Sequence, residues 1–157
     1  MSAGEVGELL VRGPQVMQGY WRDPELTRQV LTDGWFHTGD LARMDERGYV
    51  FIVGRTKEMI KYKGYTVAPA ELEALLLEHP EVKDCAVVGV ADREAGEIPK
   101  AFVVLKSGAS VDGDALVDFL RNKVAGYKRV RQVELVDAIP RSPSGKILRR
   151  LLAEQAK

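Results

Sequence analysis

The feature that most constrains the fold is a pair of apolar runs separated by only six residues. The first run is VKDCAVVGVAD (82–92), the second is PKAFVVLK (99–106), and the loop REAGEI (93–98) lies between them. Runs that are apolar at successive positions, and not only at alternate ones, are typical of strands that are buried on both faces. The sequence therefore predicts two strands, joined by a loop, inside a packed sheet.

Helical periodicity in three other segments provides apolar faces. The segment 68–79 has Pro69 in its first turn, where the missing N–H is tolerated, and 112–125 shows the same i, i+3, i+4 spacing. The segment 146–157 closes the chain as a third helix. The residues expected to face inward are Leu72, Leu75 and Leu76 in the first helix, Leu116, Phe119 and Leu120 in the second, and Ile147, Leu148, Leu151 and Leu152 in the third.

The order of these elements predicts a fold class. Residues 57–157 follow the order of two short strands, helix, strand, strand, helix, strand and helix, in which VRQVELVD (130–137) is the last strand. This order suits a compact α+β domain, in which a small mixed sheet has flanking helices.

The first 56 residues have a different pattern. GELLVRG (7–13) is typical of a strand, and RDPELTRQVL (22–31) is typical of a short helix with Asp23 as its cap. Strands around 41–44 and 49–53, joined by the turn DERG, predict a hairpin. So short a segment buries too little apolar surface to offset its chain entropy. We therefore expect this β-rich part to belong to something larger.

Charge and composition exclude several classes of protein. Lys plus Arg and Asp plus Glu both number 23, so no basic excess favours a nucleic acid or a membrane surface. No apolar run approaches the roughly 20 residues that span a bilayer, and the N-terminus lacks the basic and apolar parts of a signal peptide. The single cysteine, Cys85, lies in an apolar run and is expected to be a buried packing residue. These features predict a cytoplasmic protein.

A first candidate site is the acidic residue of FHTGDLA (36–42). Asp40 follows Gly39 in an expected turn between apolar segments. A carboxylate held there can accept hydrogen bonds from two hydroxyls, such as those of a ribose, and the alternative is an aspartate that only stabilises the turn. His37 and His79 lack Cys or acidic partners at metal-ligand spacing, so we expect structural roles for both and no metal site.

A second candidate is the basic segment GRTKEMIKYKGY (54–65). Because alternate residues of a strand share a face, Lys57, Lys61 and Lys63 can line one side and bind phosphates. The alternative is an edge strand that its lysines protect against aggregation. Gly64 is expected either to supply a positive φ or to let a ligand approach the backbone closely.

A third candidate is the loop PSGK (143–146). It resembles a phosphate-binding loop only superficially, because the spaced glycine before the lysine and the Ser or Thr after it are absent. Lys146 is expected to be a cation on a flexible loop at the start of the last helix, where backbone N–H groups also favour anions. The alternative is a solvated surface lysine.

Four motifs taken together resemble one enzyme family. GELLVRGPQVMQGYW, DGWFHTGDLA, GRTKEMIKYKGYTVAPAELE and PRSPSGKILRR are similar, in order and spacing, to the C-terminal third of the adenylate-forming enzymes. The segment KYKGYTVAPAELE is most similar to the corresponding sequence of 4-coumarate and fatty acyl-CoA ligases. The resemblance implies that a carboxylate attacks the α-phosphate of MgATP to give an acyl-adenylate, and that coenzyme A then gives a thioester and AMP. It also implies that the small C-terminal domain rotates between the two steps.

The resemblance assigns roles to residues of the three candidate sites. Asp40 and Arg55 match the residues that contact the ribose of the nucleotide. Lys57 falls at the hinge about which the small domain turns. Lys146 matches the lysine that bridges the carboxylate and the α-phosphate during adenylation, and Lys61 matches a lysine near the adenylate.

The resemblance assigns two further residues to the expected coenzyme A channel and leaves the role of a third, Thr66, open. Gly64 and Tyr65 belong to the loop that turns toward this channel in the thioester-forming state. Thr66 stands where the coumarate ligases have a glutamine, and its shorter side chain departs from the family pattern.

The resemblance also implies how the chain is divided. Residues 1–56 match the β-rich C-terminal edge of a large adenylation domain, and residues 57–157 match the mobile C-terminal domain. The phosphate loop, the acyl pocket and the Mg²⁺-binding glutamate of the family are absent from this sequence. We therefore expect a piece of a longer ligase of fatty acid metabolism, whose partner is an upstream N-terminal domain and whose substrates are a carboxylic acid, ATP with Mg²⁺, and coenzyme A.

Alone, this piece is expected to be inactive and to hold no ATP, Mg²⁺ or coenzyme A. Two alternatives remain at this point. One is an adenylation domain that loads a carrier protein, and the other is a non-catalytic interaction module.

Overall fold

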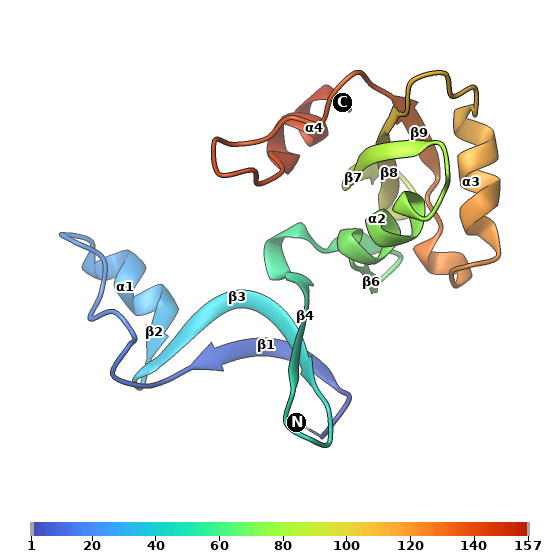
Figure 1. Ribbon diagram of the computed structural model, residues 1–157. Coiled ribbons are helices and arrows are strands. Elements are labelled where there is room, and N and C mark those ends of the chain that lie inside the picture. Colours follow the sequence, from blue (N-terminus) through green and yellow to red (C-terminus); the bar gives the residue numbers. More distant parts are fainter. Residues whose placement is uncertain (1, 157) are drawn as a thin grey trace. The chain divides into compact units, whose positions relative to one another are not determined.

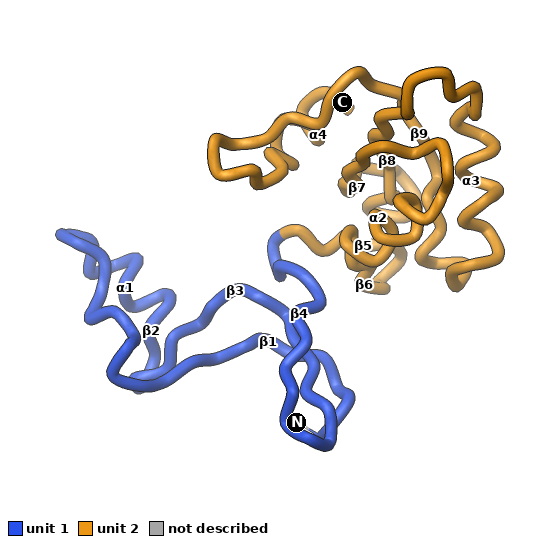
Figure 2. Tube along the Cα trace, viewed as in Figure 1, with its two compact units in different colours: residues 1–57 blue, residues 58–157 orange. Residues whose placement is uncertain are grey.

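The computed structural model describes residues 2–156, and the chain divides into two compact units. Unit 1 is Met1–Lys57 and unit 2 is Glu58–Lys157, shown in blue and orange in Figure 2. A 3₁₀ helix, η1 (Thr56–Glu58), contains the boundary. Each unit has its own sheet, so each is described separately.

Unit 1 is built around one long strand. Strand β3 (Trp35–Met44) pairs antiparallel with β1 (Val6–Val11) along one edge. Its other edge pairs with β2 (Leu31–Thr32) near one end and with β4 (Val50–Arg55) near the other. Every strand of this unit therefore depends on β3.

The short helix of unit 1 begins as the sequence predicts. Helix α1 (Pro24–Val30) has Pro24 in its first turn, and the Asp23 carboxylate accepts a hydrogen bond of 2.9 Å from the backbone N–H of Leu26. This bond satisfies one of the helix-start donors that have no partner within the helix.

Unit 2 contains a five-stranded mixed sheet, as predicted. The strands β6 (Tyr65–Val67), β5 (Ile60–Tyr62), β8 (Gly96–Leu105) and β7 (Val82–Asp92) follow one another in this order with antiparallel pairing. Strand β9 (Gln132–Leu135) runs parallel to β8. The two apolar runs are therefore neighbouring strands of a hairpin.

The β7–β8 hairpin is buried on both faces, which confirms the prediction from its unbroken apolar runs. Helices α2 (Pro69–Leu77) and α3 (Gly113–Arg121) contribute to a core cluster on one face, and α4 (Arg149–Gln155) contributes to a second cluster on the other. Figure 1 shows α3 and α4 on opposite sides of these strands. The two clusters take alternate residues of the same strands: Cys85, Val87, Ala101 and Val103 in the first, and Ala86, Val88, Phe102 and Val104 in the second.

The helical faces of α2 and α3 agree with the predicted spacing, whereas α4 differs. Helix α4 begins only at Arg149, so the expected stripe of four inward residues is not formed. Leu152 is 1% exposed, but Leu148 and Leu151 are each 37% exposed. Ile147 and Leu148 precede the helix start and therefore do not share its periodicity, whereas Leu151 lies inside the helix on a more exposed side than Leu152.

Within residues 2–156, no helix is both long enough and apolar enough to cross a membrane.

The buried thiol generates the first prediction. Cys85 is 3% exposed, and burial, followed by the charges of Glu73 and Asp84, raises its pKa to about 12. At pH 8 the thiolate is then about a thousandfold scarcer than for an ordinary cysteine, and the thiolate is the reactive form. We expect iodoacetamide to alkylate the native chain at least a hundredfold more slowly than the urea-unfolded chain. Comparable rates in the two states would contradict the buried placement.

The thin packing of unit 1 generates the second prediction. Among its described residues, 2–57, Ala42 is the one that is buried, whereas Ile52 is 59% exposed and Trp21 is 86% exposed. Regions with few buried apolar contacts open at low free energy. We expect amides of β3 to exchange hydrogen faster than amides of β8 in the 157-residue chain, measured by mass spectrometry. Slower exchange in β3 would show that unit 1 has a stability that its burial does not explain.

Candidate functional site

The two residues expected to contact a ribose lie side by side on neighbouring strands. Asp40 of β3 is the register partner of Arg55 of β4, and the Arg55 Nε donates to Asp40 Oδ1 at 2.8 Å. The Asp40 side chain is 27% exposed and that of Arg55 is 61% exposed. The pair thus combines a partly buried carboxylate with a more exposed cation.

The prediction that Asp40 lies in a turn is wrong. Asp40 belongs to β3, at a point where the register with β1 shifts and where Gly39 has a φ of +71°. This positive φ is favourable for glycine and strained for other residues. An irregular strand residue and a turn residue carry the same local Gly-Asp sequence, so the sequence alone does not separate them.

Hydrogen bonds that the sequence did not suggest hold this irregular segment in place. The Thr38 hydroxyl accepts from the Asp40 backbone N–H at 3.0 Å and donates to the Leu9 carbonyl at 2.8 Å. These two bonds fix the backbone of Asp40 against β1, because one hydroxyl serves both strands.

A carboxylate of β1 supports the same segment from the side. The Glu8 side chain lies 3.0 Å from His37 Nδ1, and its other oxygen accepts from the Gly39 backbone N–H at 3.3 Å. His37 therefore has the structural role that its sequence context predicts. Glu8 was missed because its partners lie about 30 positions away in the chain, where spacing patterns carry no information.

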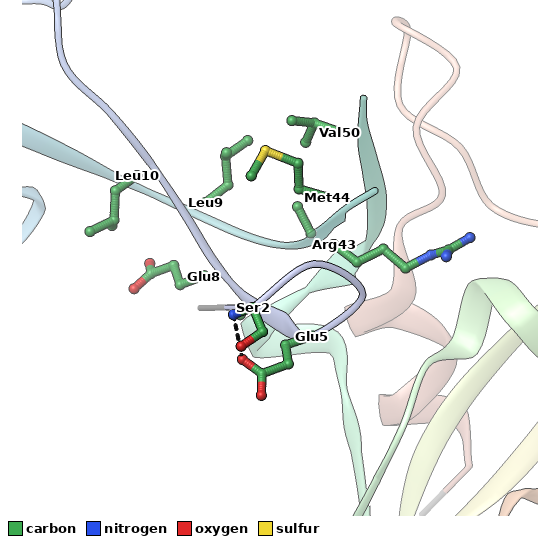
Figure 3. Close-up of a pocket in the computed structure, with 10 residues that line it drawn as sticks. Ser2, Glu5, Glu8, Leu9, Leu10, Arg43, Met44 and Val50 are labelled. Atoms are coloured by element: carbon green, nitrogen blue, oxygen red, sulfur yellow. Dashed lines mark hydrogen bonds between the residues drawn. The ribbon is translucent and has the colours of Figure 1, made fainter. Parts of the chain in front are cut away.

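A shallow hollow lies elsewhere in unit 1. Its volume is about 160 Å³, and β1, β3 and β4 contribute to its lining (Figure 3). It contains neither Asp40 nor Arg55. Its lining combines apolar residues, among them Leu10, Met44 and Val50, with the charged residues Glu5, Glu8 and Arg43.

The expectation that three lysines line one side of a strand is wrong. Strand β5 spans only Ile60–Tyr62, so it contains Lys61 alone. Lys57 lies in the 3₁₀ helix η1, and Lys63 lies in the turn after β5 with a φ of +46°. Met59, which the same alternation places with the lysines, is 8% exposed. Two changes of backbone direction within seven residues remove the strand periodicity on which the prediction rested.

Lys61 is paired with Thr66, the residue that departs from the family pattern. Lys61 and Thr66 are register partners in the β5–β6 hairpin, and the Lys61 Nζ donates to the Thr66 hydroxyl at 3.3 Å. Because the threonine side chain is short, this contact holds the ammonium group of Lys61 close to strand β6. This contact leaves Lys61 with donors that can reach an anion.

The turn between β5 and β6 has the geometry that its glycine predicts. Lys63 and Gly64 have φ values of +46° and +82°, as a two-residue turn with positive φ at both positions requires. Tyr65, which follows, is 57% exposed, and its ring stacks on Tyr127 of η2 (Gly126–Lys128) with centroids 4.6 Å apart. Gly64 and Tyr65 thus form an ordered, exposed surface.

Lys146 lies in a closed loop. Arg141 and Ile147 form a bridge that closes it, and the backbone N–H of Ser142 donates to the Lys146 carbonyl at 2.8 Å. Gly145 has a φ of +82° within this loop. The side chain of Lys146 is exposed at the surface of unit 2. The loop is therefore held by its own hydrogen bonds and presents one cation.

The expectation that Lys146 lies at the N-terminus of a helix is wrong. Helix α4 begins three residues later, at Arg149, and the Lys146 backbone N–H faces the Ser142 hydroxyl at 3.2 Å. The charge that this loop can offer an anion is that of the ammonium group, without support from a helix dipole.

An arginine that the sequence analysis missed anchors this loop. Arg141 donates to both carboxylate oxygens of Asp84 on β7, at 2.9 and 3.0 Å, and to the Gly145 carbonyl at 3.0 Å. Such a two-point contact fixes orientation as well as distance. The loop is therefore tied to the central hairpin of unit 2.

No group of three His, Cys, Asp or Glu side chains within the described part of the chain is close enough together to hold a metal ion.

Comparison with known proteins identifies relatives of both units. Residues 71–146 match the model of the family described as AMP-binding enzyme C-terminal domain. The chain is 54% identical over 145 residues to 4-coumarate–CoA ligase 2 of Nicotiana tabacum, covering 92% of this chain and 27% of that protein. It is 51% identical over 153 residues to the peroxisomal OPC-8:0-CoA ligase 1 of Arabidopsis thaliana, covering 97% and 28%.

A solved structure also resembles this chain over its whole length. ATP-bound MatB from Rhodopseudomonas palustris superposes with a TM-score of 0.95 at 39% identity, covering 100% of this chain and 31% of that chain. The chain thus spans about 28% of the length of the curated relatives that it matches. Because one relative is named as peroxisomal, the cytoplasmic setting stays a prediction.

The turn geometry generates the third prediction. Gly64→Ala places a side chain at a φ of +82°, where nothing lies within 4 Å of the new Cβ, so the cost is backbone strain and not a clash. We expect the free energy of unfolding of unit 2 to fall by about 1 kcal/mol, measured by urea denaturation. Gly126→Ala is the matched control, because its surroundings are equally open and its φ is not positive. Equal effects of the two substitutions would contradict the turn assignment.

Proposed function

Because the chain belongs to the AMP-binding enzyme family and carries its C-terminal domain, we propose that it serves an AMP-forming acid–CoA ligase. Its task is to bring Lys146 to the reaction centre for adenylation and to present another face for thioester formation. The observation that carries this proposal is the exposed Lys146 on a closed, anchored loop. The likeness to named CoA ligases supports it.

In the proposed first step, a carboxylate oxygen attacks the α-phosphorus of ATP. The new P–O bond gives the acyl-adenylate as the bond to pyrophosphate breaks. Negative charge is spread over the carboxylate and the phosphate oxygens in the transition state. An ammonium group on a long stem can lie between both groups, and an anchored loop holds it there without a large loss of entropy. The ATP named in the MatB structure supports the choice of nucleotide.

Asp40 and Arg55 are proposed to hold the ribose of that nucleotide. A carboxylate accepts hydrogen bonds from two neighbouring hydroxyls, and the contact with Arg55 orients it. Both residues lie in unit 1, which we propose to be the C-terminal edge of a large adenylation domain. Mg²⁺ is expected to accompany ATP, but no step is assigned to it from the residues of this chain.

In the proposed second step, the thiol of coenzyme A attacks the carbonyl carbon of the adenylate and AMP leaves. Lys57, at the boundary between the units, is the proposed hinge for the rotation that precedes this step. Gly64 and Tyr65 are proposed to line the approach of coenzyme A. Lys61, whose ammonium group contacts the Thr66 hydroxyl, is proposed to lie near the adenylate. The carboxylic acid is proposed to be an aryl or fatty acid, as the names of the relatives suggest. Loading of a carrier protein is the rival, and it uses the same first step.

The fourth prediction tests Lys146. The segment of tobacco 4-coumarate–CoA ligase 2 that matches this chain is replaced by the chain, and 4-coumarate is the acid. We expect Lys146→Ala to slow adenylation about 10²–10³-fold, measured by pyrophosphate exchange, because one preorganised donor is lost. Thioester formation from synthetic coumaroyl-adenylate should persist, because Lys146 acts only before that intermediate exists.

Two controls accompany this test. Lys83→Ala removes another exposed lysine of unit 2 and should change neither half-reaction. The 157-residue chain alone should form no adenylate. Equal loss in both half-reactions, or normal adenylation, would refute the role of Lys146. An inactive chimera that carries the unchanged chain would refute the proposed function itself.

A further inference from the structure

Arg149 of unit 2 is largely buried and contacts three different segments of the chain. Arg149, the first residue of α4, is only 18% exposed. Its Nε donates to Glu58 at 2.8 Å, and its two terminal nitrogens contact the Glu73 carboxylate, at 3.0 Å for the Nη2 contact. The guanidinium therefore joins η1, α2 and α4 at one point.

The same contacts complete the outer edge of the sheet. Strand β7 pairs with β8 on one side, and at Val87 its other side meets side chains. The Val87 backbone N–H donates to Glu73 at 2.7 Å, and the Val87 carbonyl accepts from Arg149 at 3.2 Å. A carboxylate and a guanidinium thus take the place of the next strand, so these buried backbone groups are not left without partners.

Arg149 stays protonated despite its burial. Burial alone would lower the pKa of Arg149, but hydrogen bonds and charge from Glu73, and then from Glu58, outweigh it and raise the pKa. Removing one partner of such a buried pair leaves an uncompensated charge. A lysine in place of Arg149 cannot reproduce the planar, forked set of donors that three partners require.

Two functionally important points of the chain are adjacent to this network. Glu58 is the first residue of unit 2 and follows Lys57 directly. Arg149 follows Lys146 by three residues, and the loop's other end is fixed by Arg141. The network therefore lies between the start of the rigid unit and the loop that carries the exposed cation.

We propose that Arg149 is a positioning residue, whose guanidinium fixes the start of unit 2 and the Lys146 loop to one rigid frame. This inference rests on the proposed function, because the position of Lys146 matters only if Lys146 acts in adenylation. Any rotation of unit 2 then moves Lys146 as part of a rigid body. Without Arg149, the first residues of unit 2 are no longer fixed to the rest of the unit. The Lys146 loop then also moves independently of the unit.

The first arm of the test uses the 157-residue chain and needs no activity. Hydrogen exchange is followed at residues 56–60 and 141–150. We expect Arg149→Lys to speed exchange at least fivefold in both segments, and Glu58→Ala to speed it in 56–60 alone. Arg150→Lys is the matched control, since Arg150 is 85% exposed and has only a 3.7 Å contact with Glu154. It should change neither segment.

The second arm uses the chimera with tobacco 4-coumarate–CoA ligase 2. We expect Arg149→Lys to lower kcat of adenylation about 10- to 100-fold at nearly unchanged KM for ATP and 4-coumarate, because substrates still bind but the cation is misplaced. Thioester formation from synthetic coumaroyl-adenylate should stay within about twofold. A merely structural role would lower both half-reactions together with the amount of folded protein.

Each outcome decides between the proposals. Unchanged exchange in both segments for Arg149→Lys, or a rise in KM at constant kcat, would overturn the positioning role. If Arg149→Lys does not fold, Glu58→Ala provides the test. Unchanged hydrogen exchange at residues 56–60 in that variant would overturn the positioning role of Arg149. If the chimera with the unsubstituted chain is inactive, that result counts against the proposed function. The hydrogen-exchange experiment would still test the contacts of Arg149.

Discussion

The burial of both faces of the β7–β8 hairpin is the constraint on which unit 2 depends. Because apolar residues occur at successive positions, one layer of helices cannot cover them. Helices α2 and α3 cover one face, and α4, with Ile139 and Leu152, covers the other. This second layer has a functional consequence. It brings the last part of the chain back onto the sheet, and the loop with Lys146 lies immediately before α4.

A second constraint acts in the plane of the sheet. The backbone groups of Val87 on the outer edge of β7 need partners, and the side chains of Glu73 on α2 and Arg149 on α4 provide them. Arg141 contacts Asp84 on this strand before the loop, and Arg149 contacts the Val87 carbonyl after it. Apolar packing therefore brings the C-terminal segment to the sheet, whereas charged contacts fix its position along the strand. Neither effect alone would set where the cation lies.

The sequence predicted the features of this fold that depend on local pattern. Unbroken apolar runs predicted the hairpin, and i, i+3, i+4 spacing predicted Leu72 and Leu116 as core residues, because both patterns report burial directly. Asp23 and Gly64 were also predicted, since a helix cap and a positive φ need only nearby residues.

The features that failed depend on partners far away in the chain. Arg149 forms ion pairs with residues 76 and 91 positions away, and nothing in its own neighbourhood indicates them. The stripe assigned to the last helix failed because α4 begins only at Arg149, so two of its four residues precede the helix. Resemblance to a family assigned roles to the candidate site residues Asp40 and Lys146, but it did not reveal what holds them.

The two units present their functional side chains in different ways, and this difference bears on how a reaction in two steps could be organised. Asp40 lies in a thin sheet whose described residues include one buried side chain, and polar contacts from Thr38 hold it. Lys146 lies on a densely packed unit, on a loop closed by its own hydrogen bonds. A cation that must act in one step and be absent from the next can move either by loop disorder or by rotation of its unit. A disordered loop would lose conformational entropy each time it became ordered for the first step, whereas an anchored loop moves with its unit at no such cost. The anchored loop therefore supports the proposed rotation of the whole unit.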